Sequence, residues 1–277
     1  MKFGIAIFPT DYAISMTELA PAVEERGFES LWVAEHSHIP TSRESPWPGG
    51  PDLPKHYWHT MDPFIALTAA ALASKTLKVA TGICLLIQRD PIHTAKETAS
   101  VDLISGGRFI FGIGAGWNRE EMADHGTNFG TRWQLLREKT EAIKAIWSED
   151  VAEYRGEMVG FGPMWSWPKP VQKPHPPVIL GGSGPKILER VVRYADGWMP
   201  NRGDVLARIP ELERMAKDAG RGRIPVTYYP KATAEEIERC AQAGVDRLIW
   251  YVPPDGRDAA LARLEELTKL VRPYLTN

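Results

Sequence analysis

Short apolar runs alternate along this chain with longer segments in which apolar residues recur at helical spacing. The runs that predict strands are residues 2–9, 30–35, 77–83, 109–114, 178–181, 197–200, 225–229 and 247–252. The helical patterns cover residues 17–26, 60–73, 90–105, 119–125 with 131–147, 185–194, 205–219, 234–243 and 258–274. The strands are apolar on both faces, which is typical of parallel sheets covered by helices. Eight strand–helix pairs within 277 residues favour an α/β fold, a (β/α)8 TIM barrel formed by residues 1–277 as one domain, over a doubly wound open sheet.

Two long stretches interrupt this alternation. Residues 36–59 follow strand two, residues 153–177 lie between strands four and five, and both stretches contain several Pro, Gly and Trp residues. The loops after the strands carry the chemistry of such a barrel, so we expect both insertions at that end, where they cover a pocket. Four tryptophans in them either form an aromatic lid over a ligand or pin the loops to the surface: Trp47, Trp58, Trp165 and Trp167.

The charge balance and the cysteine content narrow the class of protein further. There are 33 Lys and Arg against 35 Asp and Glu, a net charge of −2 without a basic block, which argues against nucleic-acid binding and a polybasic membrane contact. The apolar stretches are too short to cross a bilayer, and the amino terminus lacks the layout of a signal peptide. The two cysteines, Cys84 and Cys240, fit a reducing compartment. We therefore expect a soluble, cytoplasmic protein in which Cys84 is a packing residue.

Histidines gather at the end of the second predicted strand. Glu35, His36 and His38 would lie where a barrel opens, and a carboxylate beside imidazoles there can move protons or bind polar substrate groups. The alternative is that Glu35 and His36 only satisfy each other or a loop backbone. Together with His56 and His59, the same histidines suggest a metal-dependent hydrolase. No further ligands follow the later strands, so we predict no metal and keep that activity as an alternative.

Two glycine-rich segments are candidate ligand sites. One lies between strand five and its helix and consists of Gly181, Gly182, Ser183 and Gly184. Free N–H groups at a helix N-terminus favour an anion, although Ser183 can equally be an ordinary helix cap. The other lies where strands three and four end. Thr81, Gly82 and Ile83 end strand three, and Trp117 and Asn118 follow strand four. Glycines at strand ends permit a bulge or the close approach of a planar ring.

Taken together, several of these segments resemble the bacterial luciferase-like superfamily. The matching segments are LWVAEH at 31–36, VATGI at 79–83, SGGR at 105–108, GIGAGWN at 112–118, LGGSG at 180–184 and ADGW at 195–198. The likeness covers residues 1 to 200 and is strongest to the branch of oxidoreductases that use the deazaflavin coenzyme F420. It implies a barrel that binds a deazaflavin, or alternatively FMN, across its open end and transfers hydride to or from a small organic substrate.

The resemblance also assigns expected roles to residues. A cis peptide bond is implied at Thr81–Gly82 or Gly82–Ile83, pressing on the central ring of the cofactor. The loop 181–184 would hold the cofactor phosphate, and Glu35 and His36 would stand beside the redox ring. The residues expected on the substrate side are Trp117, Asn118, His38 and His59.

An FMN-dependent monooxygenase that uses O2 is the main alternative within the same fold. The acidic oligoglutamate tail of the deazaflavin would benefit from cations near the rim, whereas FMN ends at its phosphate. The sequence offers Lys186, Arg190, Arg193 and Arg202 for this purpose. The family likeness also suggests a homodimer.

Overall fold

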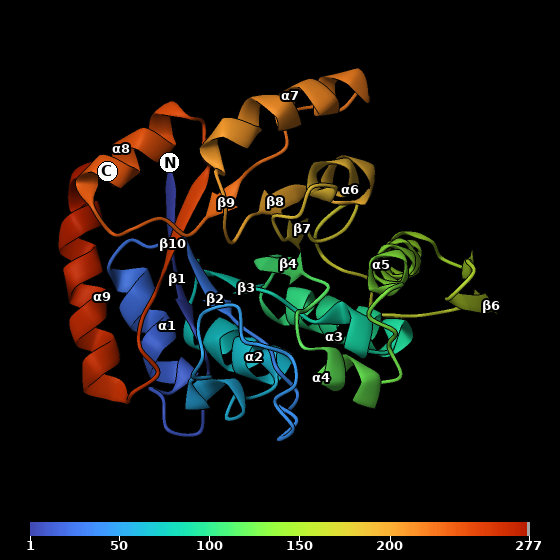
Figure 1. The fold of residues 1–277 in the computed structure, drawn as a ribbon, viewed down its shortest axis with the longest axis horizontal. Coiled ribbons are helices and arrows are strands. Elements are labelled where there is room, and N and C mark those ends of the chain that lie inside the picture. Colours follow the sequence, from blue (N-terminus) through green and yellow to red (C-terminus); the bar gives the residue numbers. More distant parts are fainter. Residues whose placement is uncertain (276–277) are drawn as a thin grey trace.

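The strands form a ring of parallel neighbours. The computed structural model describes residues 1–275, and its main sheet has eight strands in the order β8-β7-β4-β3-β2-β1-β10-β9. At the two ends of this order, β8 meets the residues before β9: Trp198 N donates to Pro225 O at 3.0 Å, and Trp198 pairs with Val226 in a parallel bridge. This contact closes the ring, so the TIM-barrel prediction is confirmed and the open sheet is excluded (Figure 1). The strands are β1 (Lys2–Ile7), β2 (Ser30–Val33), β3 (Lys78–Thr81), β4 (Phe109–Ile113), β7 (Val178–Gly181), β8 (Gly197–Met199), β9 (Thr227–Tyr228) and β10 (Arg247–Tyr251).

Helices surround the ring and begin where the sequence supplies caps. Asp62 and Asp90 accept hydrogen bonds from backbone N–H groups in the first turns of α2 and α3, each of which starts with a proline. The helices are α1 (Met16–Glu25), α2 (Pro63–Ala73), α3 (Pro91–Ile104), α4 (Arg119–Asp124), α5 (Arg132–Ser148), α6 (Ile187–Tyr194), α7 (Ile209–Asp218), α8 (Ala234–Gln242) and α9 (Arg257–Val271). Short 3-10 turns occupy Lys55–Tyr57, Leu86–Gln88, Leu206–Arg208 and Arg272–Tyr274.

The barrel interior is a small core of its own, separate from the larger one between strands and helices. Successive strand residues point to opposite faces, so alternate positions fill the interior. Trp32 is fully buried there, and its indole N–H donates to Ser30 Oγ at 2.8 Å. Each large side chain buried in this way contributes about 1.5–3 kcal/mol. The interior residues are Ala6, Trp32, Ala80, Ile110, Ile179, Met199 and Ile249.

The first insertion lies over the end of the barrel at which the strands terminate, called the mouth below. His56 packs against Phe8 with ring centroids 4.4 Å apart, and Phe8 directly follows β1. Tyr57 contacts both Phe8 and His36, at 4.9 and 5.1 Å between centroids. Trp47 meets the edge of Tyr57, so it belongs to this cover, whereas Trp58 is half exposed.

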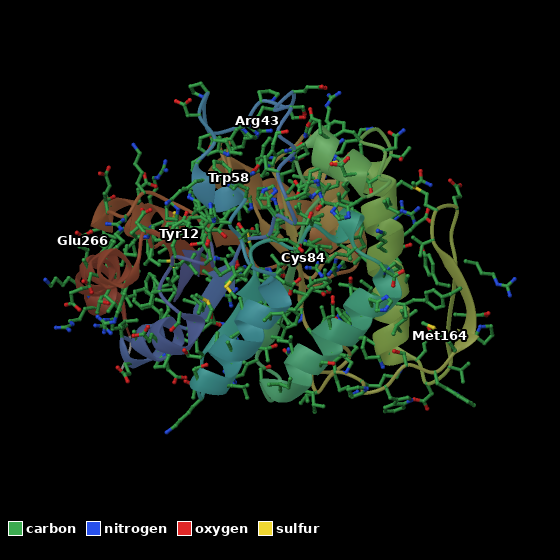
Figure 2. The ribbon with its side chains drawn as sticks, turned by 90° about the horizontal axis from the view of Figure 1, so that it is seen from below. Tyr12, Arg43, Trp58, Cys84, Met164 and Glu266 are labelled. Atoms are coloured by element: carbon green, nitrogen blue, oxygen red, sulfur yellow. The ribbon has the colours of Figure 1, made fainter. Side chains whose placement is uncertain are left out.

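The second insertion does not cover the mouth, and that prediction is wrong. It forms an antiparallel hairpin, β5 (Ala152–Arg155) with β6 (Gly160–Met164), on the outer side of α5 (Figures 1 and 2). Tyr154 Oη donates to Glu141 of α5 at 2.6 Å, which pins the hairpin there. Trp165 and Trp167 are 81% and 57% exposed. These two tryptophans are surface residues and not parts of a lid.

Candidate active site

A bulge after β3 forms part of the mouth floor. The Gly82–Ile83 peptide bond is cis, which confirms the second of the two expected positions. The Ile83 side chain lies against the ends of β4 and β7. A Cβ atom on Gly114 would stand 2.6 Å from Ile83 Cδ1, and one on Gly181 would stand 3.0 Å from Ile83 Cγ2. Glycine at both positions is therefore what lets Ile83 occupy this place.

Backbone and side-chain hydrogen bonds fix the bulge to β4. Cys84 N donates to Gly112 O at 2.7 Å, and Gly114 N donates to Cys84 O at 3.0 Å. The hydroxyl of Thr81 is fully buried and donates to Gly112 O at 2.7 Å. Thr81 thus holds the bulge in place and its hydroxyl is already engaged. Burial raises the pKa of the Cys84 thiol well above its ordinary value, which agrees with a packing role.

His36 is paired with a carboxylate that the sequence did not suggest. Its Nδ1 lies 2.8 Å from Glu121 Oε2, and both side chains are buried, 7% and 1% exposed. Since a carboxylate only accepts hydrogen bonds, Nδ1 carries a proton in this pair. The other oxygen of Glu121 accepts from Ser37 N at 3.3 Å. Glu121 is therefore held from two sides. The other ring nitrogen of His36, Nε2, makes no hydrogen bond within residues 1–275.

The short helix α4 places Glu121. Asn118 is its N-cap, with the side-chain oxygen accepting from Glu121 N at 3.2 Å. An Asn followed by Glu at the third position is a helix-start pattern, and that pattern is the signal by which Glu121 could have been noticed. The Asn118 side chain is thereby engaged in the cap. Its neighbour Trp117 meets the His36 ring edge-on, with centroids 5.9 Å apart.

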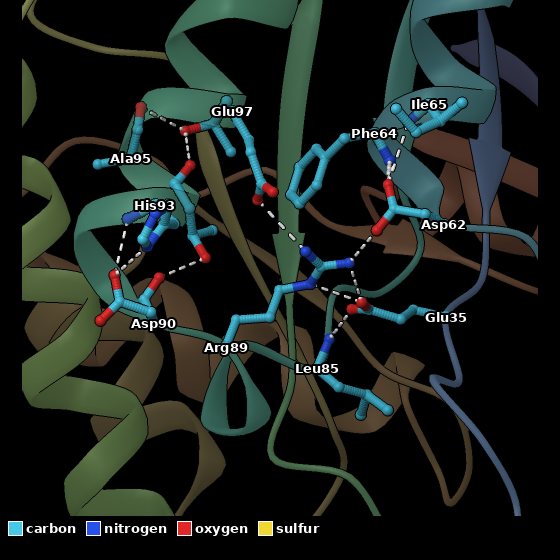
Figure 3. Close-up of polar contacts among 12 residues, drawn as sticks. Glu35, Asp62, Phe64, Ile65, Leu85, Arg89, Asp90, His93, Ala95 and Glu97 are labelled. Carbon is cyan, nitrogen blue, oxygen red and sulfur yellow. Dashed lines mark hydrogen bonds and ion pairs between the residues drawn. The ribbon is translucent and has the colours of Figure 1, made fainter. Parts of the chain in front are cut away.

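Glu35 does not pair with His36, so that part of the alternative is wrong, whereas its other part, a contact with a loop backbone, describes Glu35. Consecutive residues after a strand point in opposite directions, so Glu35 faces the helices outside the ring (Figure 3). It accepts hydrogen bonds from Leu85 N and Arg89 Nε, both at 2.6 Å. Arg89 also binds Asp62 and Glu97, at 2.5 and 3.3 Å. Burial alone would lower the pKa of Arg89, but these carboxylates, Glu35 above all, hold it above its ordinary value.

Aromatic rings line the mouth around His36, and the sequence singled out few of them. Tyr229 and Tyr251 stack with centroids 5.4 Å apart at the ends of β9 and β10. The Tyr229 hydroxyl lies next to Gly82, since a Cβ on that glycine would be 3.2 Å from Tyr229 Oη. Burial lowers the pKa of His56, which favours its neutral form. The mouth is therefore lined by aromatic rings around one buried His–Glu pair.

The predicted histidines are held separately at the rim. His38 Nε2 lies 2.9 Å from Asp124 Oδ2, and His59 Nδ1 lies 2.7 Å from Asp11 Oδ1. Among residues 1–275, no group of three or more His, Cys, Asp and Glu side chains is placed to hold a metal ion. The described structure thus does not assemble the ligand set that the metal-dependent hydrolase requires.

The glycine loop after β7 carries free backbone donors. Ser183 and Gly184 N–H groups donate no hydrogen bond within the described chain, and Gly182 has a φ of 133°. Ser183 is not a helix cap: its hydroxyl donates to Asn201 Oδ1 at 2.9 Å and accepts from the N–H groups of Asn201 and Arg202. It ties the loops after β7 and β8 together, which orients the free N–H groups.

Comparison with known proteins identifies the family. A family model described as luciferase-like monooxygenase matches residues 1–276. The chain belongs to the luciferase-like monooxygenase family. Its members are oxidoreductases or monooxygenases. None of the helices in residues 1–275 of this family member combines the length and the apolar character that a membrane span requires.

Relatives of this luciferase-like protein cover nearly its whole length. An uncharacterized protein of Mycobacterium tuberculosis is 38% identical over 275 residues, which span 96% of this chain and 97% of that protein. A 5,10-methylenetetrahydromethanopterin reductase of Methanopyrus kandleri is 26% identical and matches 95% of this chain and 74% of its own. The structure of a monooxygenase from Streptomyces bottropensis has a TM-score of 0.83 at 19% identity, with full coverage of both chains. That of the coenzyme F420-dependent tetrahydromethanopterin reductase from M. kandleri has a TM-score of 0.77 at 21% identity, with 99% coverage of both.

The mouth of this luciferase-like barrel suits a planar ring with an anionic extension. Its floor is a glycine-flanked bulge, its walls are aromatic, and the free N–H groups of Ser183 and Gly184 stand at one side. Planar rings bury well against such walls, and backbone N–H groups bind phosphate. A cavity of about 520 Å³ lies at the opposite end of the barrel, among residues that include Lys78, Arg108 and Arg247.

Proposed function

We propose that this protein is an oxidoreductase that transfers a hydride between the deazaflavin coenzyme F420 and a small organic substrate. The observation that carries the proposal is the bulge at residues 81–83, which is hydrogen-bonded to β4 at the same mouth as the buried His36–Glu121 pair. The bulge offers support to a flat ring, and the pair offers a proton-handling group beside it. The M. kandleri reductase, a relative by sequence, supports the redox assignment.

The cofactor would be held by two parts of the chain. The backbone of Thr81, Gly82 and Ile83 would support the ring, and the loop 181–184 would bind the phosphate through the N–H groups of Ser183 and Gly184. When bound, the deazaflavin supplies a ring carbon that accepts or delivers hydride. The aromatic walls keep water away from that carbon, which strengthens the interactions inside the mouth.

His36 is the residue that we assign to proton transfer. His36 Nδ1–H donates a hydrogen bond to Glu121 Oε2, with 2.8 Å between the nitrogen and the oxygen, so the neutral ring has its lone pair on Nε2. That atom can take a proton from a substrate hydroxyl or return it to a carbonyl as hydride moves. The buried Glu121 carboxylate stabilises the imidazolium that forms, and the N-terminal turn of α4 in turn stabilises the carboxylate. Glu35 then acts as a positioning residue, since it holds Leu85 behind the bulge.

The substrate would enter from the rim. Trp117 next to His36 forms one wall, and His38 and His59, which are held by Asp124 and Asp11, stand farther out. Asn118 contributes indirectly, because its cap on α4 positions Glu121.

A cofactor titration tests the proposal. We expect coenzyme F420 to quench the tryptophan fluorescence with a micromolar or lower Kd, while FMN binds at least about tenfold more weakly. Tighter binding of FMN, together with oxygen uptake by the reduced complex, would instead identify an FMN-dependent monooxygenase. The Gly114→Ala variant shows whether the mouth is the binding site, because its added Cβ would stand 2.6 Å from Ile83 and disturb the bulge. It should weaken binding of whichever cofactor uses the mouth.

A further inference from the structure

Three arginines gather on the outer side of the mouth without a carboxylate partner. The guanidinium groups of Arg119 and Arg132 lie over the ring of Phe129, at 4.2 and 3.5 Å from its centroid. Arg190 lies over Trp133 at 4.2 Å. Within residues 1–275, none of the three forms an ion pair with Asp or Glu, unlike most arginines of this chain. We refer to Arg119, Arg132 and Arg190 as the arginine cluster.

The positive charges of the arginine cluster have no carboxylate partner within residues 1–275. Burial, and then the charges of Arg119 and Arg190, lower the pKa of Arg132. Arg132 Nε is buried and has no hydrogen-bond partner in the described chain. Arg132 also opens α5, whose N-cap Thr131 makes no side-chain cap. Glu120 is the carboxylate next to Arg119, and it is engaged by Ser45. An anion at this place would satisfy charges and donors that the protein leaves open.

The arginine cluster begins where the glycine loop ends. A Cβ on Gly182 would be 3.5 Å from Trp133 Cη2, and Trp133 carries Arg190 on its face. Arg132 lies 5.8 Å from the same indole and continues to Phe129 and Arg119. The cluster thus extends from α6 over the start of α5 to the start of α4, three helices that lie on the same side of the barrel in Figure 1. If a ligand bound its phosphate on the loop 181–184, the part of that ligand beyond the phosphate would reach the arginine cluster.

We infer that the arginine cluster binds a flexible oligocarboxylate chain, the oligoglutamyl tail of the deazaflavin. The inference rests on the proposed function and goes beyond it, because it assigns the tail to residues outside the glycine loop. Guanidinium groups bind carboxylates in a two-pronged geometry, and their aromatic supports keep them oriented. FMN ends at its phosphate and would leave the cluster empty.

Tail removal combined with a single substitution tests this inference. Natural oligoglutamyl F420 and the same coenzyme stripped of its glutamyl residues are titrated against wild type and Arg190→Gln by tryptophan fluorescence. One charge-assisted contact accounts for about a tenfold change in Kd. We expect Arg190→Gln to weaken the tailed form about tenfold and the stripped form less than twofold. Arg214→Gln is the matched control, because Arg214 is an exposed arginine of α7 paired with Asp218.

A second titration uses hexaglutamate alone and separates the two claims. Direct binding of hexaglutamate, read by tryptophan fluorescence and lost in Arg190→Gln, supports the cluster even if the deazaflavin ring fails to bind, in which case only the proposed function is wrong. Equal Kd values for the tailed and stripped coenzyme would overturn the inference. So would an equal loss in Arg214→Gln, or hexaglutamate that neither binds nor competes.

Discussion

Replacing Glu29 by Gln should destabilise the barrel in a pH-dependent way. Glu29 precedes β2 and receives two hydrogen bonds from Arg247 of β10, at 2.8 and 2.9 Å, across the intervening strand β1. Lys78 lies 3.0 Å away, and the Glu29 side chain is 22% exposed. Burial raises the pKa of Glu29, but the two cations outweigh it and lower the pKa from 4.5 to about 2.

That pKa difference sets the size of the effect. A shift of about 2.5 units corresponds to about 3.4 kcal/mol of folding free energy. The folded-state pKa is the lower one, so this stability is fully present above about pH 5 and is lost as the pH falls towards 2. About 1.4 kcal/mol remains at pH 3. Glu29→Gln should therefore cost about 3 kcal/mol at pH 7 and about half as much at pH 3.

Urea unfolding of wild type and variant at pH 7, 5, 4 and 3 measures this difference. Glu25→Gln is the control, because Glu25 is an exposed carboxylate of α1 that forms no ion pair within the described residues. It should change the free energy of unfolding by less than about 0.5 kcal/mol. A loss for Glu29→Gln that is the same at every pH would refute the argument, as would a loss below about 1 kcal/mol at pH 7.

Three further substitutions test the site. Arg89→Met should destabilise the protein by about 3–5 kcal/mol in urea unfolding, because it leaves the Glu35 carboxylate, 5% exposed, without its cation; an unchanged midpoint would contradict this. Glu121→Gln should lower turnover of a converted substrate about ten- to hundredfold with unchanged cofactor Kd, since the amide no longer stabilises cationic His36; equal turnover would remove Glu121 from the account. Gly112→Ala should lower the free energy of unfolding by about 1–3 kcal/mol, because its Cβ would stand 2.0 Å from a carbonyl oxygen of β3; a Tm equal to wild type would show that the strands adjust freely.

The fold was predictable because its signals are local. Apolar strands followed by capped helices, such as Asp62 before α2 and Asp90 before α3, mark each unit in the sequence. Strand ends were predicted too long, since β2 stops at Val33 and β3 at Thr81, where the chain turns into the mouth. The second insertion was misplaced because its anchor, Tyr154 on Glu141, joins residues whose pairing no local pattern announces.

The site was predictable only in part. The cis bond at Gly82–Ile83 and the position of His36 followed from motifs that the chain carries in full. The partner of His36 lies 85 residues away, and that of Glu35 lies 54 residues away at Arg89. Such pairs depend on how neighbouring strands and α4 are arranged in space. Adjacent residues such as Glu35 and His36 suggest a pair, yet the alternation of side chains after a strand separates them.

A crystal structure of the protein with coenzyme F420 tests the central claim most directly. The account predicts the deazaflavin ring against Ile83 at the mouth, its phosphate on the N–H groups of Ser183 and Gly184, and His36 Nε2 facing the redox carbon. A ring bound instead in the cavity at the opposite end, between Lys78, Arg108 and Arg247, would contradict it. So would a ring at the mouth whose redox carbon faces away from His36 Nε2.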